Sequence, residues 1–277
     1  PENVLGQFKG TDDLATEKEH VKYWLGEAFK NLISATDCDG FRVDAIKHVE
    51  KSWCLQWADD MRKHAASLGK NDFILFGEYF SYDNAALASY VTSPGSFNSA
   101  LFFPMANTIK SVFVDGGWTG QLTQTLSAKS QYGEGENRLV AFIDNHDLDR
   151  IGLKISASGD TGRISWVMKP ALTWLYTGTP VPCLYYGTEH GFNQGGHYNG
   201  SNKTADNPDD GDWQRECMFN KGFQPGPASG DKLSETNAPL YQHIKALNAA
   251  RASYPALTRG NFSERWQNGS AGAYAFS

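Results

Sequence analysis

The stretch GFRVDAIKHVE, residues 40–50, decides how the rest of the chain is interpreted. It begins as a short apolar strand, yet it carries five ionisable side chains. Alternation along a strand directs Arg42 and Asp44 to one face and the apolar residues beside them to the other. A guanidinium and a carboxylate on a buried strand are costly unless they pair or act on another molecule. Asp44 is therefore the first candidate for a chemical role.

Two further acidic residues follow apolar segments in the same way. Glu78 comes after FILFG at 73–77, and Asp147 ends LVAFIDNHD at 139–147. Asp44 lies 34 residues before Glu78, which lies 69 residues before Asp147. One strand and one helix of a (β/α)8 barrel take roughly 30 residues, so these intervals correspond to one and two such units. The spacing predicts three acidic side chains at the carboxyl ends of parallel strands, where such barrels build their active sites.

The remaining pattern alternates helices with short strands. Apolar periodicity predicts helices at 17–33, 51–67, 164–176 and 239–252. Apolar runs predict strands at 73–76, 99–103, 139–143 and 179–187, besides the one after Gly40. Residues 189–232 form a Gly, Asn and Asp-rich excursion, which is too long for a simple connection. From Glu264 onward, the sequence predicts a hairpin with a Gly turn.

The fold class that follows is α/β, a TIM (β/α)8 barrel of which this chain supplies strands 4 to 8. Residues 1–253 are predicted to belong to the barrel, and residues 254–277 to begin a C-terminal β domain. The 39 residues before Gly40 are too few for three more units, so the first three strands are expected upstream. Five strands would leave open sheet edges, which favours self-association with another copy.

Composition excludes several kinds of partner. The chain has 25 basic and 31 acidic residues, and no stripe of Lys and Arg suits a phosphate backbone, which argues against nucleic acid. No apolar run approaches the roughly 20 residues of a membrane span. The N-terminal PENVLGQFKG lacks the pattern of a signal peptide, but sequons such as Asn199 fit a secreted chain, and an extracellular location is expected.

The three acids suit the hydrolysis of a glycosidic bond, which two carboxyl groups can catalyse through an oxocarbenium-like transition state. Arg42 favours the ionised form of Asp44, as a nucleophile requires. The apolar run before Glu78 predicts desolvation that raises the pKa of this carboxyl, as a general acid requires. Asp147, beside His146, suits the binding of sugar hydroxyls while positive charge develops. Each acid alone would more often cap a helix or form an ion pair, so the combination carries the inference.

Three motifs resemble signature regions of the alpha-amylase family of glycoside hydrolases. GFRVDAIKH at 40–48, GEYF at 77–80 and FIDNHD at 142–147 resemble the second, third and fourth regions in the right order. The resemblance extends from TDDL at 11–14 to ERW at 264–266 and covers nearly the whole chain. It implies an enzyme that cleaves α-1,4-glucosidic bonds of starch-like glucans through a covalent glycosyl-enzyme intermediate.

The resemblance also implies a role for each motif residue. Asp44 would be the nucleophile, Glu78 the general acid and base, and Asp147 the stabiliser of the transition state. The implied contacts that orient the nucleophile, hold sugar hydroxyls or line the leaving-group side are Arg42, Lys47, His48 and His146.

A structural Ca²⁺ is implied by the TDDL segment, where the family usually has LPDL. The side chain of Asp13 and the backbone carbonyl of His48 would be ligands, and oxygen ligands are what Ca²⁺ prefers. Alternatively, Asp13 caps the helix that follows it.

Two departures from the family pattern affect the site. The first signature region, with an Asn and a second His, is absent from this chain, so the catalytic and calcium sites are expected to be incomplete on it alone. The loop DGDWQRE at 210–216 is one residue shorter than the family's usual form. Its Asp212 and Arg215 are candidate sugar ligands.

Two alternatives stay open. Glucanotransferases of the same family transfer the glycosyl group to a sugar, often with a Phe shortly after the Lys-His pair; Glu50 and Lys51 stand there in this chain and favour hydrolysis. A glucan-binding subunit or an inactive barrel fragment is the non-enzymatic alternative. Glucan-binding relatives typically lose one of the three acids, whereas this chain keeps all three. The fragment alternative rests instead on the missing first three strands.

Overall fold

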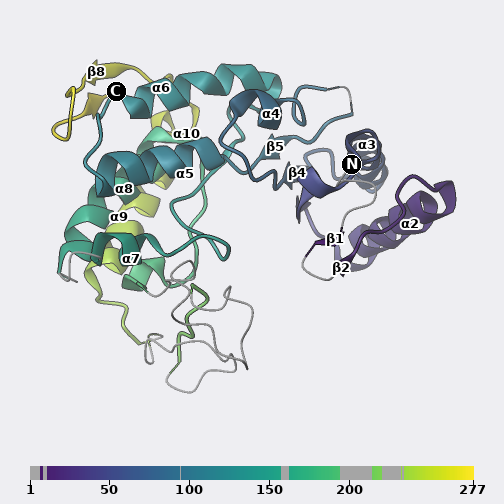
Figure 1. Cartoon of the computed structure of the whole chain (residues 1–277), viewed down its shortest axis with the longest axis horizontal. Helices are drawn as coiled ribbons and strands as arrows, with labels where there is room; N and C mark the ends of the chain where they lie inside the picture. Colours follow the sequence, from purple (N-terminus) through teal and green to yellow (C-terminus); the bar gives the residue numbers. More distant parts are fainter. Residues whose placement is uncertain are drawn as a thin grey trace. The chain divides into compact units, whose positions relative to one another are not determined.

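The computed structural model describes most of the chain, and the chain divides into two compact units (Figure 1). The described residues are 7–8, 11–93, 95–156, 162–193, 214–219, 232 and 234–277. Unit 1 consists of Pro1–Pro104 and Ser127–Val140, and unit 2 of Met105–Leu126 and Ala141–Ser277. The predicted loop ligand Asp212 lies outside the described residues.

Unit 1 is built on a parallel sheet with the strand order β3-β4-β5. Its elements, in chain order, are β1 (Gln7–Phe8), β2 (Thr11–Asp12), α2 (Glu19–Thr36), β3 (Gly40–Val43), η1 (Ile46–His48), α3 (Lys51–Ser67), β4 (Ile74–Gly77), α4 (Asn84–Ala88), β5 (Ser99–Ala100) and η3 (Ala128–Gly135). A helix lies between each pair of consecutive parallel strands. The order β3, α3, β4, α4, β5 confirms the predicted alternation of strands and helices in this part of the chain.

The register of the sheet fixes which side chains share a face. Phe41 pairs with Leu75 and Val43 with Gly77, and the ladder continues to β5. A parallel bridge between Leu101 and Val140 extends the series. Among the described residues, β3 pairs only with β4. The predicted self-association through an open strand edge remains a prediction.

Helices α2 and α3 form the layer that covers this sheet on one side. Phe41 and Val43 of β3 pack against a buried core that includes Ile33 of α2, Met61 of α3 and Leu75 of β4. The alternating residues of β3, Arg42 among them, therefore belong to the opposite face of the strand. The predicted division of this strand into an apolar and a charged face is confirmed.

Helix α3 spans the predicted residues 51–67. It ends because Gly69 adopts φ +86°, and the N–H groups of Gly69 and Lys70 donate to Ala66 and Ala65 carbonyls at 2.9 Å. Helix α2 runs three residues further than the predicted 17–33, to Thr36, since Asp37 takes the left-handed conformation with φ +55° and closes the helix.

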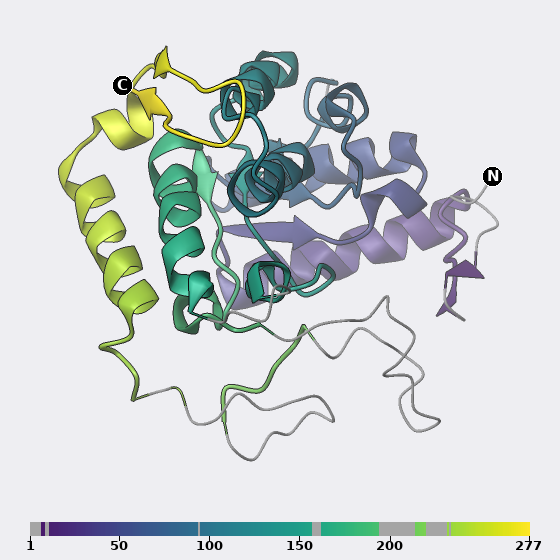
Figure 2. The ribbon, with the colours of Figure 1, turned by 60° about the vertical axis from the view of Figure 1, so that its left-hand side comes forward.

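Unit 2 is mainly helical, and its longest helices, α8 and α9, pack side by side (Figure 2). The elements from residue 103 onward, apart from η3, are α5 (Phe103–Ile109), the π-helical η2 (Lys110–Val114), α6 (Gln121–Ser127), β6 (Val140–Ala141), α7 (Ile151–Ser156), α8 (Arg163–Gly178), β7 (Val181–Pro182), η4 (Thr188–His190), α9 (Pro239–Ser253), α10 (Ala256–Arg259), β8 (Glu264–Trp266) and β9 (Ala275–Phe276). The predicted helices at 164–176 and 239–252 correspond to α8 and α9.

The predicted C-terminal hairpin is confirmed as the antiparallel pair β8–β9. It packs on α8 through Trp174, which is 2% exposed and meets the rings of Phe262, Tyr274 and Phe276 edge to face at 5.2–5.6 Å between centroids. The proposed boundary between residues 253 and 254 remains a prediction.

Three strands are shorter than predicted. The strand predicted at 99–103 stops at Ala100, because helix α5 begins at Phe103. The strand predicted at 179–187 shrinks to Val181–Pro182, since Pro180 and Pro182 have no N–H to donate to a ladder. Of the strand predicted at 139–143, only Val140–Ala141 forms a strand, β6.

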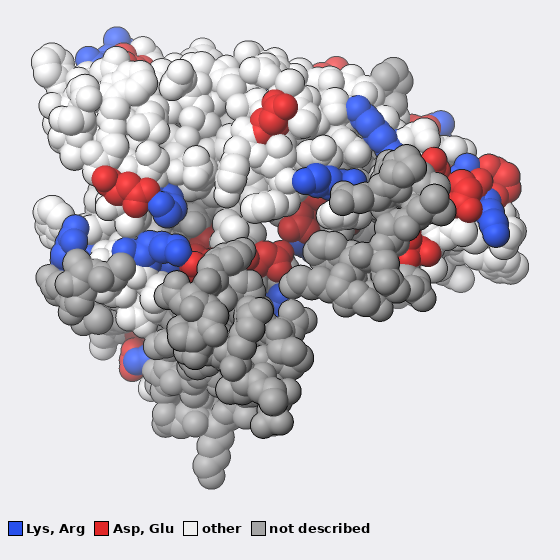
Figure 3. Space-filling view, viewed as in Figure 1, with Lys and Arg blue, Asp and Glu red and all other residues white. Residues whose placement is uncertain are grey.

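The distribution of surface charge and the character of the helices concern two predictions, that nucleic acid and membranes are not partners. On the face drawn in Figure 3, the described Lys and Arg side chains lie interspersed with Asp and Glu, not in one continuous band. Within the described ranges, no helix combines the length and the apolar character that crossing a bilayer requires.

Candidate active site

The register of two parallel strands places Asp44 beside Glu78. Val43 and Gly77 are the last paired residues of β3 and β4, so each acid is the first residue beyond its strand. The N–H of Glu78 donates to the Val43 carbonyl at 2.8 Å, and the N–H of Ile46 donates to the Glu78 carbonyl at 3.0 Å. The two acids are thus held by backbone hydrogen bonds at the carboxyl ends of neighbouring strands.

Two glycines of the motifs are required by close packing. A Cβ added to Gly77 would lie 2.4 Å from Cδ1 of the buried Ile46. A Cβ added to Gly40 would lie 2.3 Å from the Ile74 carbonyl oxygen, which belongs to the paired strand and cannot move aside. The glycines in GFRVD and GEYF therefore let the two acid-bearing segments approach each other.

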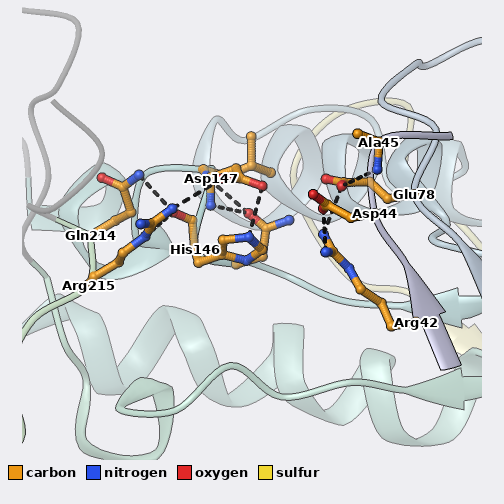
Figure 4. A network of polar contacts seen from close by, with 10 residues as sticks. Arg42, Asp44, Ala45, Glu78, His146, Asp147, Gln214 and Arg215 are labelled. Atoms are coloured by element: carbon orange, nitrogen blue, oxygen red, sulfur yellow. Dashed lines mark hydrogen bonds and ion pairs between the residues drawn. The ribbon is translucent and has the colours of Figure 1, made fainter. Parts of the chain in front are cut away.

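Arg42 bridges the two carboxyl groups (Figure 4). Its Nη2 donates to Oε2 of Glu78 at 2.8 Å, and its Nη1 donates to Oδ1 of Asp44. The N–H of Ala45 also donates to Oε2 of Glu78, at 3.3 Å. Ala45 has φ +48°, a left-handed conformation that non-glycine residues rarely adopt. The turn after Asp44 is therefore strained, and it directs a backbone donor at Glu78.

The two acids have opposite environments. The Asp44 side chain is 70% exposed, whereas the Glu78 side chain is 11% exposed. Burial, followed by a hydrogen bond with Asp44, raises the pKa of Glu78 to about 7, against the opposing effects of Arg42 and the Ala45 N–H. The direction predicted from the FILFG run is confirmed, with burial as its main cause. One carboxyl group suits a nucleophile and the other a proton donor near neutral pH.

Lys47 and His48 follow the same strand. Nζ of Lys47 lies 6.0 Å from the ring centroid of Tyr79, and the N–H of His48 donates to the Ala45 carbonyl at 2.9 Å. Both residues belong to η1, directly after the bridged acids. Their predicted contacts with sugar remain predictions.

A second polar cluster, in unit 2, surrounds Asp147 (Figure 4). His146 Nε2 lies 3.1 Å from Asp147 Oδ2, and Arg215 Nη2 lies 3.5 Å from Asp147 Oδ1. Asn145 Oδ1 accepts the N–H groups of Asp147 and Leu148 at 2.9 and 2.8 Å, which closes a tight turn. The structure therefore joins three of the predicted residues, His146, Asp147 and Arg215.

A segment far along the chain supports this turn. Gln214 Nε2 and Arg215 Nε both donate to the His146 carbonyl, at 2.8 and 3.3 Å. Gln214 is 2% exposed, so its side chain is fixed by packing as well. The prediction from sequence missed Gln214, because nothing local to DGDWQRE indicates that its amide reaches the DNHD segment.

Arg150, which is 0% exposed, links the Gln214 segment to the chain that follows Asp147. Its Nε donates to the Gln214 carbonyl at 2.8 Å, and its Nη1 to the Tyr186 carbonyl at 2.6 Å. Its guanidinium carbon lies 4.0 Å from the ring centroid of Tyr185. A fully buried arginine with these partners is a structural link between three loops. In the sequence, Arg150 is distinguished only by its position three residues after Asp147.

Asp144 is the buried acid near Arg150. It is 1% exposed, and it accepts the N–H of Ile151 at 3.2 Å and the hydroxyl of Thr188 at 2.9 Å. Burial raises the pKa of Asp144, while the Arg150 charge acts in the opposite direction. Asp144 is thus enclosed by the fold, and Asp147 is the acid of DNHD that remains accessible.

Asp13 and His48 are the predicted calcium ligands, and the alternative that Asp13 caps the next helix is wrong, because Lys18 is the N-cap of α2. The Asp13 side chain is exposed, and His48 ends η1. Carboxylate and carbonyl oxygens suit Ca²⁺ in kind, but the ion takes 6–8 ligands and these two residues supply only two. No group of three or more His, Cys, Asp or Glu side chains within the described ranges could hold a metal. No chemical step is therefore assigned to a metal.

The sequence is similar to known alpha-amylases and cyclomaltodextrin glucanotransferases. It matches the family described as alpha amylase, catalytic domain, over residues 4–260. An alpha-amylase from Streptomyces lividans is 31% identical over 282 residues, covering 99% of this chain and 30% of the relative. A cyclomaltodextrin glucanotransferase from Klebsiella oxytoca is 27% identical, covering 92% of this chain and 39% of the relative.

Solved structures show the same similarity of fold. An Anoxybacillus alpha-amylase superposes with a TM-score of 0.74 and 25% identity, over 96% of this chain and 51% of that protein. An alpha-amylase from Geobacillus thermoleovorans, solved with acarbose, gives 0.74 and 26% over 95% and 51%. The chain thus spans about half of these solved structures and less than half of the two relatives above.

Proposed function

Because the chain belongs to the alpha-amylase family, we propose that it carries the catalytic acids of a retaining glycoside hydrolase that cleaves α-1,4-glucosidic bonds in starch-like glucans. The chain has the fold of part of an alpha-amylase (β/α)8 barrel, and we assign its strands to positions 4–8. The observation that carries the proposal is the Arg42 bridge between an exposed Asp44 and a buried Glu78.

The proposed reaction uses the two bridged acids in turn. A carboxylate oxygen of Asp44 attacks the anomeric carbon while Glu78 gives its proton to the departing glycosidic oxygen. A covalent glycosyl ester on Asp44 results. Glu78, now ionised, then takes a proton from water, whose oxygen attacks the same carbon and releases Asp44. Asp147 would stabilise the positive charge that develops in both steps.

Retention is favoured over inversion by the closeness of the two acids. Inverting enzymes keep their carboxyl groups roughly 6.5–9.5 Å apart so that a water fits between them. One guanidinium, that of Arg42, donates to both Asp44 and Glu78, so the two carboxyl groups lie within reach of a single side chain. This closeness supports a covalent intermediate on Asp44 over a water that attacks from between the two acids.

The remaining predicted residues would bind the sugar chain. We propose Lys47 and His48 as contacts on the leaving-group side, and His146 with Arg215 as contacts around the cleaved bond. Arg215 also lies 3.5 Å from Asp147, so it would orient that acid. Asp212 is proposed on resemblance alone.

Hydrolysis is proposed over glycosyl transfer because Glu50 and Lys51 stand where transferring relatives often have a Phe. The relatives include both alpha-amylases and cyclomaltodextrin glucanotransferases. A protein carrying this chain should release mainly linear sugars from starch, measured by chromatography of the products. Mainly cyclic products would establish the transferase alternative.

Calcium is proposed as a structural ion with the Asp13 carboxylate and the His48 carbonyl among its ligands. Removal of Ca²⁺ by EDTA should lower the unfolding temperature, and Asp13→Asn should shrink that shift. An Asp13→Asn variant that responds to EDTA like the parent would show that Asp13 is not a calcium ligand. An extracellular location is proposed as well, and fractionation of a native culture would test it.

The function is tested by removing each acid. In a protein carrying this chain, Asp44→Asn and Glu78→Gln should each lower kcat on maltooligosaccharides by about a thousandfold or more, with glucan binding kept. Asp39→Asn is the matched control, because Asp39 has a 93% exposed side chain that pairs with Lys70 outside the cluster. Proton NMR should detect the α-anomer as the first product.

Parent-like turnover in either acid variant, or release of the β-anomer first, would contradict the proposed function. Loss of activity in Asp39→Asn as well would point to a general loss of folding.

A further inference from the structure

A groove between α2 and α3, in unit 1, is separate from the bridged acids. It has a volume of about 210 Å³, and Tyr23, Trp53 and Trp57 are its aromatic lining residues. The two helices cover the apolar face of β3, whereas Arg42 and Asp44 belong to the other face. The groove is therefore on the outer helical layer, and the proposed reaction makes no use of it.

Both cations in the lining of this groove pair with acids, and Asp60 is a further acid in the lining. Lys22 Nζ lies 2.8 Å from Glu19 Oε1, and Lys30 Nζ lies 3.0 Å from Glu27 Oε1. All four residues line the groove. Both cations thus already have anionic partners, which favours an uncharged ligand that forms hydrogen bonds over a phosphate or a metal ion.

A buried aromatic ring forms part of the lining. Trp57 is 6% exposed, and its ring packs edge to face on Phe29 at 5.2 Å between centroids. Its Nε1 has no hydrogen-bond partner among the described residues and is itself closed to solvent. The ring is therefore a fixed apolar surface in the lining, and its N–H serves as a probe of changes beside it.

The opposite wall presents an exposed ring. Tyr23 is 59% exposed, and Trp24 meets it edge to face at 5.2 Å between centroids. An aromatic face next to amide and carboxylate groups suits a ring that is apolar on its faces and polar at its rim. Gln56, also in the lining, supplies such an amide.

We propose that this groove is a second carbohydrate site, which binds one glucosyl unit of an α-glucan chain on the outer face of α2 and α3. Its volume is below the ~300–1,000 Å³ of pockets for larger ligands, which limits it to a single sugar ring. The identity of the ligand rests on the proposed function. The site would tether the polymer and take no part in bond cleavage.

The first experiment measures retardation in native gels that contain soluble starch, with Glu78→Gln as the parent so that the polymer stays intact. Tyr23→Ala and Gln56→Ala should each weaken starch binding by roughly three- to tenfold. Tyr254→Ala is the matched control, because Tyr254 is 64% exposed and does not line the groove. Parent-like retardation of both groove variants would overturn the proposal.

The second experiment follows the indole N–H of Trp57 by NMR during titration with maltose. The signal, assigned with a Trp57→Phe variant, should shift as a sugar ring occupies the groove that Trp57 lines, and Tyr23→Ala should reduce the shift. A folded protein whose Trp57 signal ignores saturating maltose would overturn the proposal. Neither readout needs turnover, so the two proposals can fail separately. A protein with all three acids intact that cleaves no starch but shows both effects would contradict the proposed function and leave this site standing.

Discussion

The two acid clusters of this chain are built in different ways. Asp44 and Glu78 are positioned by two paired strands, and backbone hydrogen bonds continue past the last paired residues. Asp147 follows the two-residue strand β6, and side-chain amides and guanidinium groups from distant segments hold its turn. Strand pairing fixes the first cluster through the register. The second depends on buried polar side chains, each of which can be removed by one substitution.

The largest expected effect comes from replacing Arg150, which supports the second cluster. Arg150→Met would keep much of the volume but leave the Gln214 and Tyr186 carbonyls without the donor that they share. We expect a loss of about 3–5 kcal/mol in the free energy of unfolding, because each buried acceptor that loses its partner costs about 1–3 kcal/mol. Urea unfolding measures this loss.

Arg259→Met is the control for this change, because Arg259 lies exposed on α10. A loss below about 1 kcal/mol in Arg150→Met would mean that Arg150 does not support the loops, and the contrast between the clusters would fail.

The next effect tests the burial of Glu78. Its pKa of about 7 lies above the ordinary value of 4.5, so the folded state binds more protons than the unfolded state between these pH values. Stability should therefore fall as pH rises from 4.5 through 7, by on the order of 3 kcal/mol from this group. Glu78→Gln should remove that part of the pH dependence.

Unfolding free energies of both proteins at pH 4.5 and 7.5 give the comparison, with exposed Glu17→Gln as the control. Equal pH dependence in the parent and in Glu78→Gln would show that Glu78 is not held in a buried, protonated state.

The smallest expected effect concerns the exposed ion pair between Arg215 and Asp147, at the edge of the second cluster. Arg215 and Asp147 are both more than a third exposed, and their ion pair is 3.5 Å long. Arg215→Ala should therefore change stability by less than about 1 kcal/mol. A larger loss in thermal unfolding would place Arg215 with Arg150 among the structural links, against our description of it as a sugar contact.

Sequence could predict the first cluster because its determinants are local. Alternation in GFRVD and the 34-residue spacing to Glu78 place both acids at neighbouring strand ends, and the register confirms it. The left-handed Ala45 turn was not predictable, since Ala gives no signal for positive φ. The extent of β6 was overestimated because its apolar run continues into a buried loop, and that of β7 because Pro180 and Pro182 interrupt the ladder.

The second cluster could be predicted only in part. The motif identified His146 and Asp147, and the structure brings both to Arg215. Gln214 and Arg150 escaped prediction because their partners are backbone carbonyls in segments 36–68 residues away. Such contacts depend on loop packing, which no periodicity encodes.

The most direct measurement of the central claim is to trap the covalent intermediate. A protein carrying this chain with Glu78→Gln can accept α-maltotriosyl fluoride, whose leaving group needs no acid, but it lacks the base that would release the sugar. Peptide mass spectrometry should find one maltotriosyl group on Asp44, and none when Asp44→Asn is added. An adduct on another residue, or hydrolysis without any adduct, would contradict the assignment of Asp44 as the nucleophile.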